Sequence, residues 1–332
     1  MPTWFDRFRG GPAVAEGSEK VLAGQRFVMS NGILRSQALV SDTQAQTKDA
    51  FGFKWNQRDT FEGEHALARV REWLLERYGN PDQWLRGLPK NPIVLDAGCG
   101  AGMSAMEYFE PIKQHIGYLG IDISNAVDVA RKRFESRGWQ AGFMQADIVN
   151  LPFENESVEL IFSEGVLHHT DSTRNALLSL TRLLKPGGRF LFYVYRRKGP
   201  VREFTDDYIR ERLQGLEGSA AWRALQPLTR LGVKLGELGA EIDIPEPIDL
   251  LGIPAGKISV QRLFYWHVAK MFHHPEYSLD EMNHINFDWY MPKNAFRQSI
   301  EEVRAWCVEA GLRIERERIE EAGITVAAIR EY

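Results

Sequence analysis

Three glycines alternate with other residues directly after an apolar run, and an acidic residue precedes them. The segment VLDAGCGAG, residues 94–102, contains Asp96, Gly98, Gly100 and Gly102. Glycine is required where the backbone takes a positive φ or approaches a ligand closely. A carboxylate at the start of such a turn suits a ligand that carries hydroxyl groups or positive charge. We therefore expect a small-molecule site here, with a plain strand-to-helix turn as the alternative.

Two further acids are spaced as a nucleoside site would require. Asp122 stands in GIDIS, twenty residues after Gly102, where an acid at a strand end accepts hydrogen bonds from ribose hydroxyls. Asp147 stands in QAD, twenty-five residues further, where an adenine amino group would lie. A nicotinamide dinucleotide site prefers Gly-x-Gly-x-x-Gly and a helix N-terminus for its pyrophosphate. S-adenosylmethionine has no phosphate, so an acid before the glycines suits it better.

Candidates for acid–base chemistry follow the fourth and fifth apolar runs. Glu164, His168 and His169 stand in FSEGVLHH, and Tyr195 ends the fifth run. Histidine titrates near neutral pH, so either histidine is a candidate to take a proton from an acceptor, and a structural role in the loop is the alternative. The basic run RRK after Tyr195 is either a grip for an acceptor carboxylate or phosphate, or a solvated turn.

The elements that must position these residues alternate between strands and helices, which predicts a parallel sheet with helices on both faces. Apolar and turn patterns place strands at 93–97, 118–122, 142–146, 158–162 and 189–195, with an antiparallel pair at 312–319 and 324–329. Helices are expected at 64–78, 124–138, 173–184 and 300–309.

Three regions follow from this pattern. Residues 1–60 form an irregular N-terminal extension with one hairpin closed by Asn31 and Gly32. Residues 61–199 and 293–332 form the core. Residues 200–292 show helices and no obvious strand, and they are too long for a simple connection. The aromatic residues of this insertion predict a helical lid over an acceptor, which brings His267 and Tyr290 toward Tyr195 and His168 at the reacting groups. The alternative is a dimerisation element, and thus a homodimer.

Composition limits the partners. Net charge is −4 over 332 residues, with no run of five like charges, so we expect no nucleic-acid partner and a small-molecule acceptor instead. The only cysteines, Cys99 and Cys307, exclude a disulfide framework and a cysteine-rich zinc site. The start MPTWFDRFRG lacks a signal-peptide core, and no stretch approaches the ~18 apolar residues of a membrane span. We expect a cytoplasmic protein.

Four segments resemble the ordered motifs of class I S-adenosylmethionine-dependent methyltransferases, and within these the type 11 branch: VLDAGCGAG, GIDIS, QADIVNLPFENESVELIFSEGVLHH and LLKPGG. The resemblance covers residues 90–198 tightly and 296–330 loosely. It implies a Rossmann-like, doubly wound α/β sheet of seven strands in the order 3-2-1-4-5-7-6, with the last strand antiparallel. It also implies S-adenosylmethionine as cofactor and S-adenosylhomocysteine as product. The cofactor residues it implies are Asp96, Gly98, Cys99, Gly100, Asp122, Ile123, Asp147 and Ile148.

The N-terminal segments NGILR and FGFKW resemble bacterial methyltransferases that begin with a small zinc ribbon. No cysteine precedes Cys99, so we expect a remnant of that fold without metal. Phe51, Phe53 and Trp55 are expected to cover the cofactor, with packing against the helix at 64–78 as the alternative. The activity implied is methyl transfer to O, N or C of a small or medium organic acceptor, such as a metabolite, quinone-like ring, lipid or sugar. A protein or RNA methyltransferase and a non-catalytic S-adenosylmethionine-binding protein are the alternatives.

Overall fold

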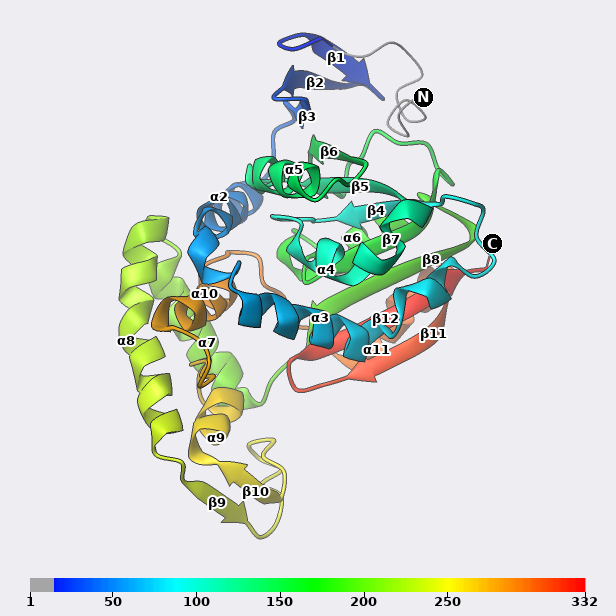
Figure 1. Ribbon diagram of the computed structural model, residues 1–332. Coiled ribbons are helices and arrows are strands. Elements are labelled where there is room, and N and C mark those ends of the chain that lie inside the picture. The colour runs from blue at the N-terminus through cyan, green and yellow to red at the C-terminus, as the bar shows by residue number, and fades with distance from the viewer. Residues whose placement is uncertain (1–14, 332) are drawn as a thin grey trace.

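The computed structural model describes residues 15–331 and has one large mixed sheet at its centre (Figure 1). The strand order is β1-β2-β3-β6-β5-β4-β7-β8-β12-β11. The five parallel core strands are β4 (Ile93–Ala97), β5 (Gly117–Asp122), β6 (Ala141–Gln145), β7 (Val158–Glu164) and β8 (Leu184–Tyr195). The last strand, β12 (Gly323–Arg330), lies antiparallel between β8 and β11 (Leu312–Ile319).

The sheet has ten strands, so the prediction of seven was wrong. The predicted order is present from β6 to β11, but β1 (Glu19–Leu22), β2 (Gln25–Ser30) and β3 (Ile33–Ser36) extend the sheet beyond β6. The hairpin closed by Asn31 and Gly32 is confirmed, and both residues have the positive φ that such a turn requires. One hairpin was predicted here, but the segment has a second antiparallel pairing, because β1 also pairs with β2. Residues 1–14 of the predicted extension lie outside the described residues.

β3 joins the core sheet through a parallel pairing with β6, in which Leu34 aligns with Met144. The Arg35 side chain strengthens this junction because its guanidinium donates to Gln145 and forms a 2.7 Å ion pair with Asp128. This attachment depends on residues about a hundred positions apart, which explains why local patterns did not predict it.

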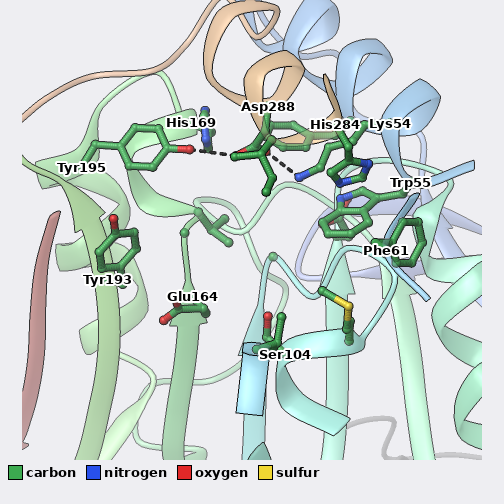
Figure 2. A pocket seen from close by; sticks show the side chains of 18 of the residues that line it. Lys54, Trp55, Phe61, Ser104, Glu164, His169, Tyr193, Tyr195, His284 and Asp288 are labelled. Atoms are coloured by element: carbon green, nitrogen blue, oxygen red, sulfur yellow. Dashed lines mark hydrogen bonds and ion pairs between the residues drawn. The ribbon is translucent and has the colours of Figure 1, made fainter. Parts of the chain in front are cut away.

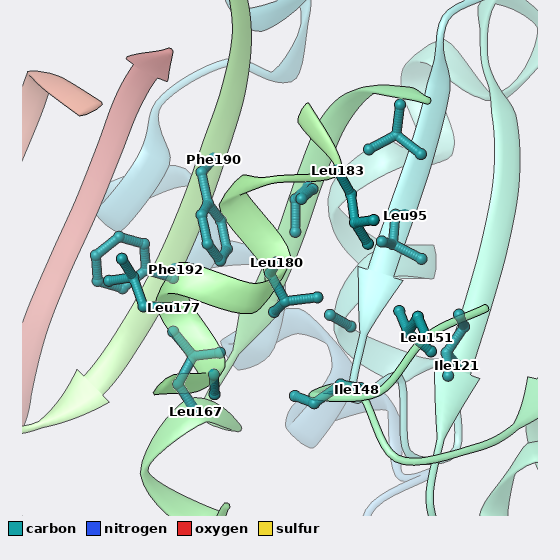
Figure 3. Close-up of a cluster of buried hydrophobic side chains, with 14 of the residues drawn as sticks. Leu95, Ile121, Ile148, Leu151, Leu167, Leu177, Leu180, Leu183, Phe190 and Phe192 are labelled. Carbon is teal, nitrogen blue, oxygen red and sulfur yellow. The ribbon is translucent and has the colours of Figure 1, made fainter. Parts of the chain in front are cut away.

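Helices cover both faces of the sheet, as predicted. One face carries α3 (Glu64–Tyr78), α4 (Met103–Phe109) and α5 (Ala126–Ser136), and the other carries α6 (Thr173–Thr181) and α11 (Ile300–Glu309). Figure 3 shows the second face, where Leu177 and Leu180 of α6 contact Leu95 and Phe190 of the strands within one buried cluster. Strands buried on both faces read as continuous apolar runs, which is why the sequence located them well.

The prediction that residues 1–60 are otherwise irregular was wrong, because α2 spans Asp42–Asn56. The Ser41 hydroxyl caps this helix by accepting the Gln44 N–H, as a good N-cap does. The buried positions of α2 include Gln44, Thr47 and Lys54, which are polar. A helix with a polar buried face shows no apolar periodicity, so the pattern gave no signal.

The insertion is mostly helical and leaves the carboxyl end of β8, where Figure 1 shows it beside α2. Its elements are α7 (Pro200–Leu213), α8 (Gly218–Glu237), β9 (Glu241–Ile244), β10 (Gly256–Ser259), α9 (Val260–His267) and α10 (Leu279–Tyr290). The β9–β10 ribbon corrects the expectation of no strand. Its strands are short, and three of the four β9 residues are exposed, so the apolar alternation of a half-buried strand is missing. Four short 3-10 helices complete the elements: η1 (Arg58–Thr60), η2 (Pro81–Leu85), η3 (Glu110–His115) and η4 (Leu167–His169).

Candidate active site

A cavity of about 310 Å³ lies at the carboxyl ends of the core strands. Ligands bind at this edge in open α/β sheets. The floor of the cavity comes from strand ends and the loops after them, and its walls come from α2, α3 and the insertion. Figure 2 shows labelled side chains from these elements converging on one space.

The glycine turn has the geometry that its sequence predicts. Gly98, Gly100 and Gly102 have φ values of 89°, 51° and 75°. The backbone N–H groups of Gly98 and Cys99 both donate to the carbonyl of Ile121, which fixes the turn to β5. A Cβ on Gly98 would lie 2.2 Å from Val166, and one on Gly100 would lie 2.8 Å from the Trp55 indole nitrogen. Neither position has room for a side chain.

Only part of the predicted turn faces the cavity. Gly98 lines it, whereas Cys99 and Gly100 are not among the lining residues, and Trp55 stands against Gly100. Asp96 does not line the cavity either. Its carboxyl accepts the Tyr118 hydroxyl at 2.5 Å below the turn, and burial raises its pKa to about 7. Asp96 thus lies outside the cavity lining and is bonded to Tyr118, and its contact with the cofactor stays a prediction.

Asp122 lines the cavity beside Ile123, as predicted. Its Oδ1 accepts the N–H and O–H of Ser124, and its Oδ2 accepts the Gly100 N–H at 2.9 Å. Because each carboxylate oxygen has about two acceptor positions, one position on Oδ2 is left for a ligand hydroxyl. Burial raises the pKa of Asp122 above its usual range.

Asp147 and Ile148 also line the cavity, beyond the end of β6. The Asp147 carboxylate accepts the N–H of Val149 at 3.0 Å, which holds it in place at this edge. Gly98, Asp122 and Asp147 thus surround one space from three adjacent strand ends. A closely approached backbone and two acids suit the hydroxyls and amine of a nucleoside joined to an amino acid, so these residues fit S-adenosylmethionine.

His169 is the better placed of the two histidines. It lines the cavity, and its Nδ1 lies 2.6 Å from the carbonyl oxygen of Asn294. A carbonyl only accepts, so Nδ1 carries the proton and Nε2 is an unprotonated acceptor. Nε2 has no hydrogen-bond partner among the described residues. Burial lowers the pKa of His169 to about 4, so the ring is neutral at pH 7.

His168 is not a candidate for catalysis, which corrects the prediction. Its side chain is fully buried, and it does not line the cavity. The ring lies against Tyr195 with centroids 3.7 Å apart, and burial lowers its pKa well below the usual value. The alternative interpretation, a structural histidine in the loop, fits this geometry.

Glu164 and Tyr195 line the cavity as predicted, but both are already engaged. The Glu164 carboxylate pairs with the Arg77 guanidinium and accepts the Tyr78 hydroxyl at 2.6 Å. The Tyr195 hydroxyl donates to Asp288 at 2.9 Å, and burial raises its pKa well above the usual value. Tyr195 is therefore a neutral donor in this arrangement and is not a base.

The sequence did not predict an ion pair that lines the cavity between α2 and the insertion. Asp288 of α10 accepts Lys54 Nζ of α2 at 2.5 Å on Oδ1 and the Tyr195 hydroxyl on Oδ2 (Figure 2). Burial alone would raise the pKa of Asp288, but the positive charges of Lys54 and Lys270 outweigh it and lower the pKa far below its usual range. The signals available were Lys54 in FGFKW and Asp288 in NFDWY, but no local pattern pairs them.

Of the three aromatic residues expected to cover the cofactor, Phe51 and Trp55 line the cavity and Phe53 does not. Its ring packs against Trp222 and Phe287 of the insertion, with centroids 6.2 and 5.4 Å away, and it does not line the cavity. Its neighbours Lys54 and Trp55 line the cavity instead. One helical position is about 100° of rotation, so a neighbouring residue on α2 faces a different way.

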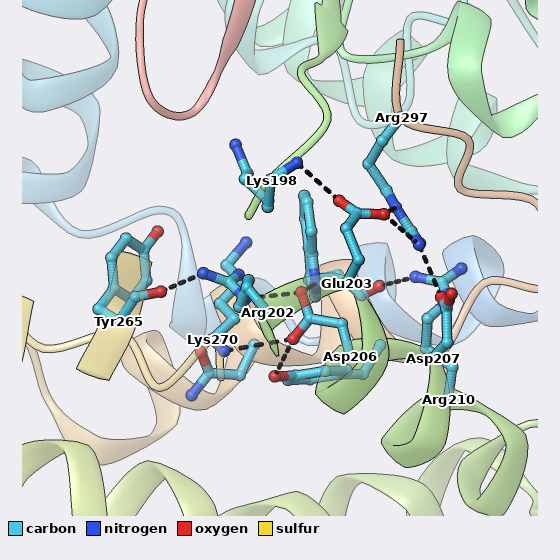
Figure 4. Close-up of polar contacts among 12 residues, drawn as sticks. Lys198, Arg202, Glu203, Asp206, Asp207, Arg210, Tyr265, Lys270 and Arg297 are labelled. Carbon is cyan, nitrogen blue, oxygen red and sulfur yellow. Dashed lines mark hydrogen bonds and ion pairs between the residues drawn. The ribbon is translucent and has the colours of Figure 1, made fainter. Parts of the chain in front are cut away.

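The insertion lines the cavity, but not through the residues expected. His267 and Tyr290 are not among the lining residues. The Tyr290 hydroxyl donates to Asp206 at 2.7 Å instead, and Asp206 also pairs with Arg202 (Figure 4). The lining residues contributed by the insertion are Tyr265, Lys270, Phe272, Tyr277, Glu281, His284, Ile285 and Asp288.

The basic run after β8 does not reach the cavity. The guanidinium of Arg197 pairs with Glu302 at the surface, and the Lys198 ammonium donates to the carbonyls of Glu321 and Ala322. Among residues 15–331, no group of three or more His, Cys, Asp or Glu side chains could hold a metal ion. No helix within the same range is long and apolar enough to cross a membrane.

The buried neutral His169 predicts a loss of stability in acid. Its folded pKa of about 4 lies below the unfolded value near 6.5, so the unfolded chain binds the proton more readily between these pH values. Stability present above pH 6.5 is lost as pH falls toward 4, by up to about 3 kcal/mol from this residue.

Thermal unfolding of wild type and His169→Gln should therefore converge as pH falls through this window. His168, His284 and Asp96 also have shifted pKa values, but they remain in both proteins and largely cancel in the difference. His65→Gln, at an exposed position, is the control. A constant difference in unfolding free energy between wild type and His169→Gln over this range would contradict the assignment.

Comparison with known proteins agrees with this geometry. Residues 95–192 match a family model described as a methyltransferase domain. The O-methyltransferase rstn1 of Aspergillus nomiae is 35% identical over 40% of this chain and 57% of its own length. The tRNA (carboxymethyluridine(34)-5-O)-methyltransferase ALKBH8 of Mus musculus is 31% identical over 39% of this chain and 18% of its own. The phthiotriol/phenolphthiotriol dimycocerosates methyltransferase of Mycobacterium leprae is 30% identical over 37% of this chain and 45% of its own.

The chain thus spans less than two thirds of the length of each of these relatives, and their names cover different acceptors. The residues that match the family model include the glycine turn and the acids Asp122 and Asp147 of the cavity. The central part of this chain is therefore similar to methyltransferase domains.

Proposed function

We propose that this protein transfers a methyl group from S-adenosylmethionine to O, N or C of a small or medium organic acceptor. The observation that carries the proposal is the continuity of the cavity. The same cavity that Gly98, Asp122 and Asp147 line on the strand side is closed on the other side by aromatic residues of α2 and the insertion. An aromatic wall around a limited volume favours an organic molecule over a macromolecular surface.

The protein has to align the acceptor with the methyl group, exclude water from the reacting groups and remove the acceptor's proton. S-adenosylmethionine, when bound, supplies a methyl group already activated for in-line displacement. Asp122 holds the ribose, and the glycine turn allows close approach of the backbone. Side chains of α2 and the insertion exclude water from the reacting groups, which protects the transfer. The neutral Nε2 of His169 accepts the proton of an acceptor hydroxyl or amine.

An RNA acceptor is the second candidate because one relative carries a tRNA methyltransferase name. Incubation with S-adenosylmethionine labelled on the methyl group separates the two. Label should enter a low-molecular-mass extract and not total tRNA. Label recovered in tRNA would reject the small-molecule acceptor while leaving the methyltransferase assignment intact.

Asp122→Ala should weaken S-adenosylhomocysteine binding by about 1.5 to 3 kcal/mol, or roughly ten- to a hundredfold, because a charge-assisted hydrogen bond to the ribose is lost. Isothermal titration calorimetry measures this loss. Asp82→Ala, at an exposed position in η2, should leave the affinity unchanged. An Asp122→Ala protein that binds as tightly as wild type would remove Asp122 from the cofactor site.

A further inference from the structure

Lys270 is a buried lysine that lines the cavity from the insertion. It is 7% exposed and follows α9 in the segment that leads to α10. Its backbone N–H donates to Asp206 (Figure 4), but its ammonium group makes no hydrogen bond or ion pair with any residue from 15 to 331. The face of the Trp289 ring, 4.9 Å from Nζ, is its nearest favourable contact.

Asp288 is the acid with the largest electrostatic effect on Lys270, but no hydrogen bond or ion pair joins the two side chains. The Asp288 carboxylate pairs with Lys54 through Oδ1 and accepts the Tyr195 hydroxyl on Oδ2. Asp206 is likewise occupied by Arg202 and by donors from α10. Asp288 therefore neutralises the charge of Lys54, and the charge of Lys270 has no carboxylate paired with it.

No other charged side chain of the cavity lining pairs with Lys270 among the described residues. Arg77 is paired with Glu164, and Glu281 accepts the Ser278 N–H in the capping box of α10. Arg210 donates to the carbonyls of Trp289 and Pro292. This side of the lining holds three cations, Lys54, Arg77 and Lys270, and three acids, Glu164, Glu281 and Asp288, and Lys270 is the cation whose side chain has no hydrogen-bond or ion-pair partner among residues 15–331.

A buried ammonium without a partner is costly, because it has lost its hydration and gained no hydrogen bond. Burial, with Arg202 and Lys54 acting in the same direction, lowers the pKa of Lys270 to about 8, so it still carries its proton at pH 7. The free-energy cost of burying the Lys270 ammonium is offset when an anion enters the cavity. Charge-assisted recognition of a carboxylate requires a charged donor at the ligand space, and Lys270 is among the residues that line the cavity.

This inference rests on the proposed methyl transfer and deepens it: we propose that the acceptor is an organic acid whose carboxylate binds Lys270 Nζ. The apolar body of the acid lies against the aromatic lining, to which Tyr195, Tyr265, Phe272 and Tyr277 contribute. The hydroxyls of Tyr193 and Tyr265 line the same cavity and have no hydrogen-bond partner within the described chain, so both are available as further donors.

The test uses the full chain saturated with S-adenosylhomocysteine. Ligand-observed NMR screens a panel of aromatic carboxylic acids, each beside its primary amide of the same shape, and phenyl phosphate as a second kind of anion. Acids should bind roughly tenfold or more tighter than their amides, as a charge-assisted hydrogen bond predicts. Lys270→Met should abolish that preference, and Lys270→Arg should retain part of it.

Lys234→Met is the matched control, because Lys234 lies on the same insertion with an exposed ammonium paired to Glu237. It should keep the preference for acids. Lys270→Met should unfold at the same temperature as wild type or higher, since an unpaired buried cation is replaced by an apolar chain of similar length. A lower unfolding temperature would leave Lys270→Arg as the deciding variant.

Calorimetry with S-adenosylhomocysteine on the same sample distinguishes failure of the proposed function from failure of the carboxylate site alone. No binding of S-adenosylhomocysteine would overturn the proposed function. Binding of S-adenosylhomocysteine without any acid bound, with amides bound equally well, or with the acid preference intact in Lys270→Met would overturn the carboxylate site alone. Binding of phenyl phosphate in preference to the carboxylates would replace the carboxylate with a phosphate ester.

Discussion

Alanine at Gly98 should weaken S-adenosylhomocysteine binding by roughly a hundredfold or more. The residue has a φ of 89°, where an L side chain is strained, and its new Cβ would lie 2.2 Å from the Val166 side chain. Val166 also lines the cavity, so relief of the clash would move it or the turn within the ligand space. Calorimetric titration with S-adenosylhomocysteine measures the effect.

Gly187→Ala is the control that separates strain from crowding. Gly187 has a φ of 78° but meets no atom within 4 Å of a built Cβ, and it lies in β8 at the amino-terminal side of that strand. Its replacement should lower stability by about 1 kcal/mol and leave cofactor affinity unchanged. Equal losses of affinity in both variants would mean that general destabilisation, and not the shape of the turn, explains the result.

Asp288→Asn should destabilise the folded protein by about 2 to 4 kcal/mol. The substitution keeps the shape of the side chain but leaves the buried Lys54, and Lys270 beside it, without the carboxylate that offsets their charge. The Asp288 side chain is 23% exposed toward the cavity, so solvent screens part of the loss and the lower half of the range is expected. Chemical denaturation measures the free energy of unfolding.

A double-mutant cycle tests the cause of that loss. Lys54→Met should recover part of the stability lost in Asp288→Asn, because it removes the cation that the substitution leaves unpaired. Glu309→Gln breaks an exposed pair with Arg174 and should cost less than about 1 kcal/mol. Additive effects of Lys54→Met and Asp288→Asn would show that the pair does not act as a unit.

Much of the fold could be predicted because the evidence for it is local. Helix α3 and strand β4 have the predicted bounds, since a 3.6-residue apolar period and a continuous apolar run leave little choice of structure. The sequence also distinguished the exposed from the buried member of the last strand pair. β11 is rich in charged residues because it lies at the edge of the sheet, and β12 is apolar because it is buried between two strands. The weakly patterned elements, α2 and the β9–β10 ribbon, were missed.

The sequence by itself determined the cofactor side of the site. The glycine turn and the acids Asp122 and Asp147 follow successive strands, and parallel strands bring their carboxyl ends to one edge. That result needs only the order of the elements and the length of each one, both of which short motifs encode.

Only the tertiary structure decided the acceptor side. Lys54 and Asp288 are 234 residues apart, and whether they meet depends on how α2 and α10 pack at the edge of the sheet. The same packing buries His168, leaves His169 at the cavity and withholds a partner from Lys270. The partners and burial of an ionisable group depend on atoms brought close by folding, and neighbours in sequence do not report them.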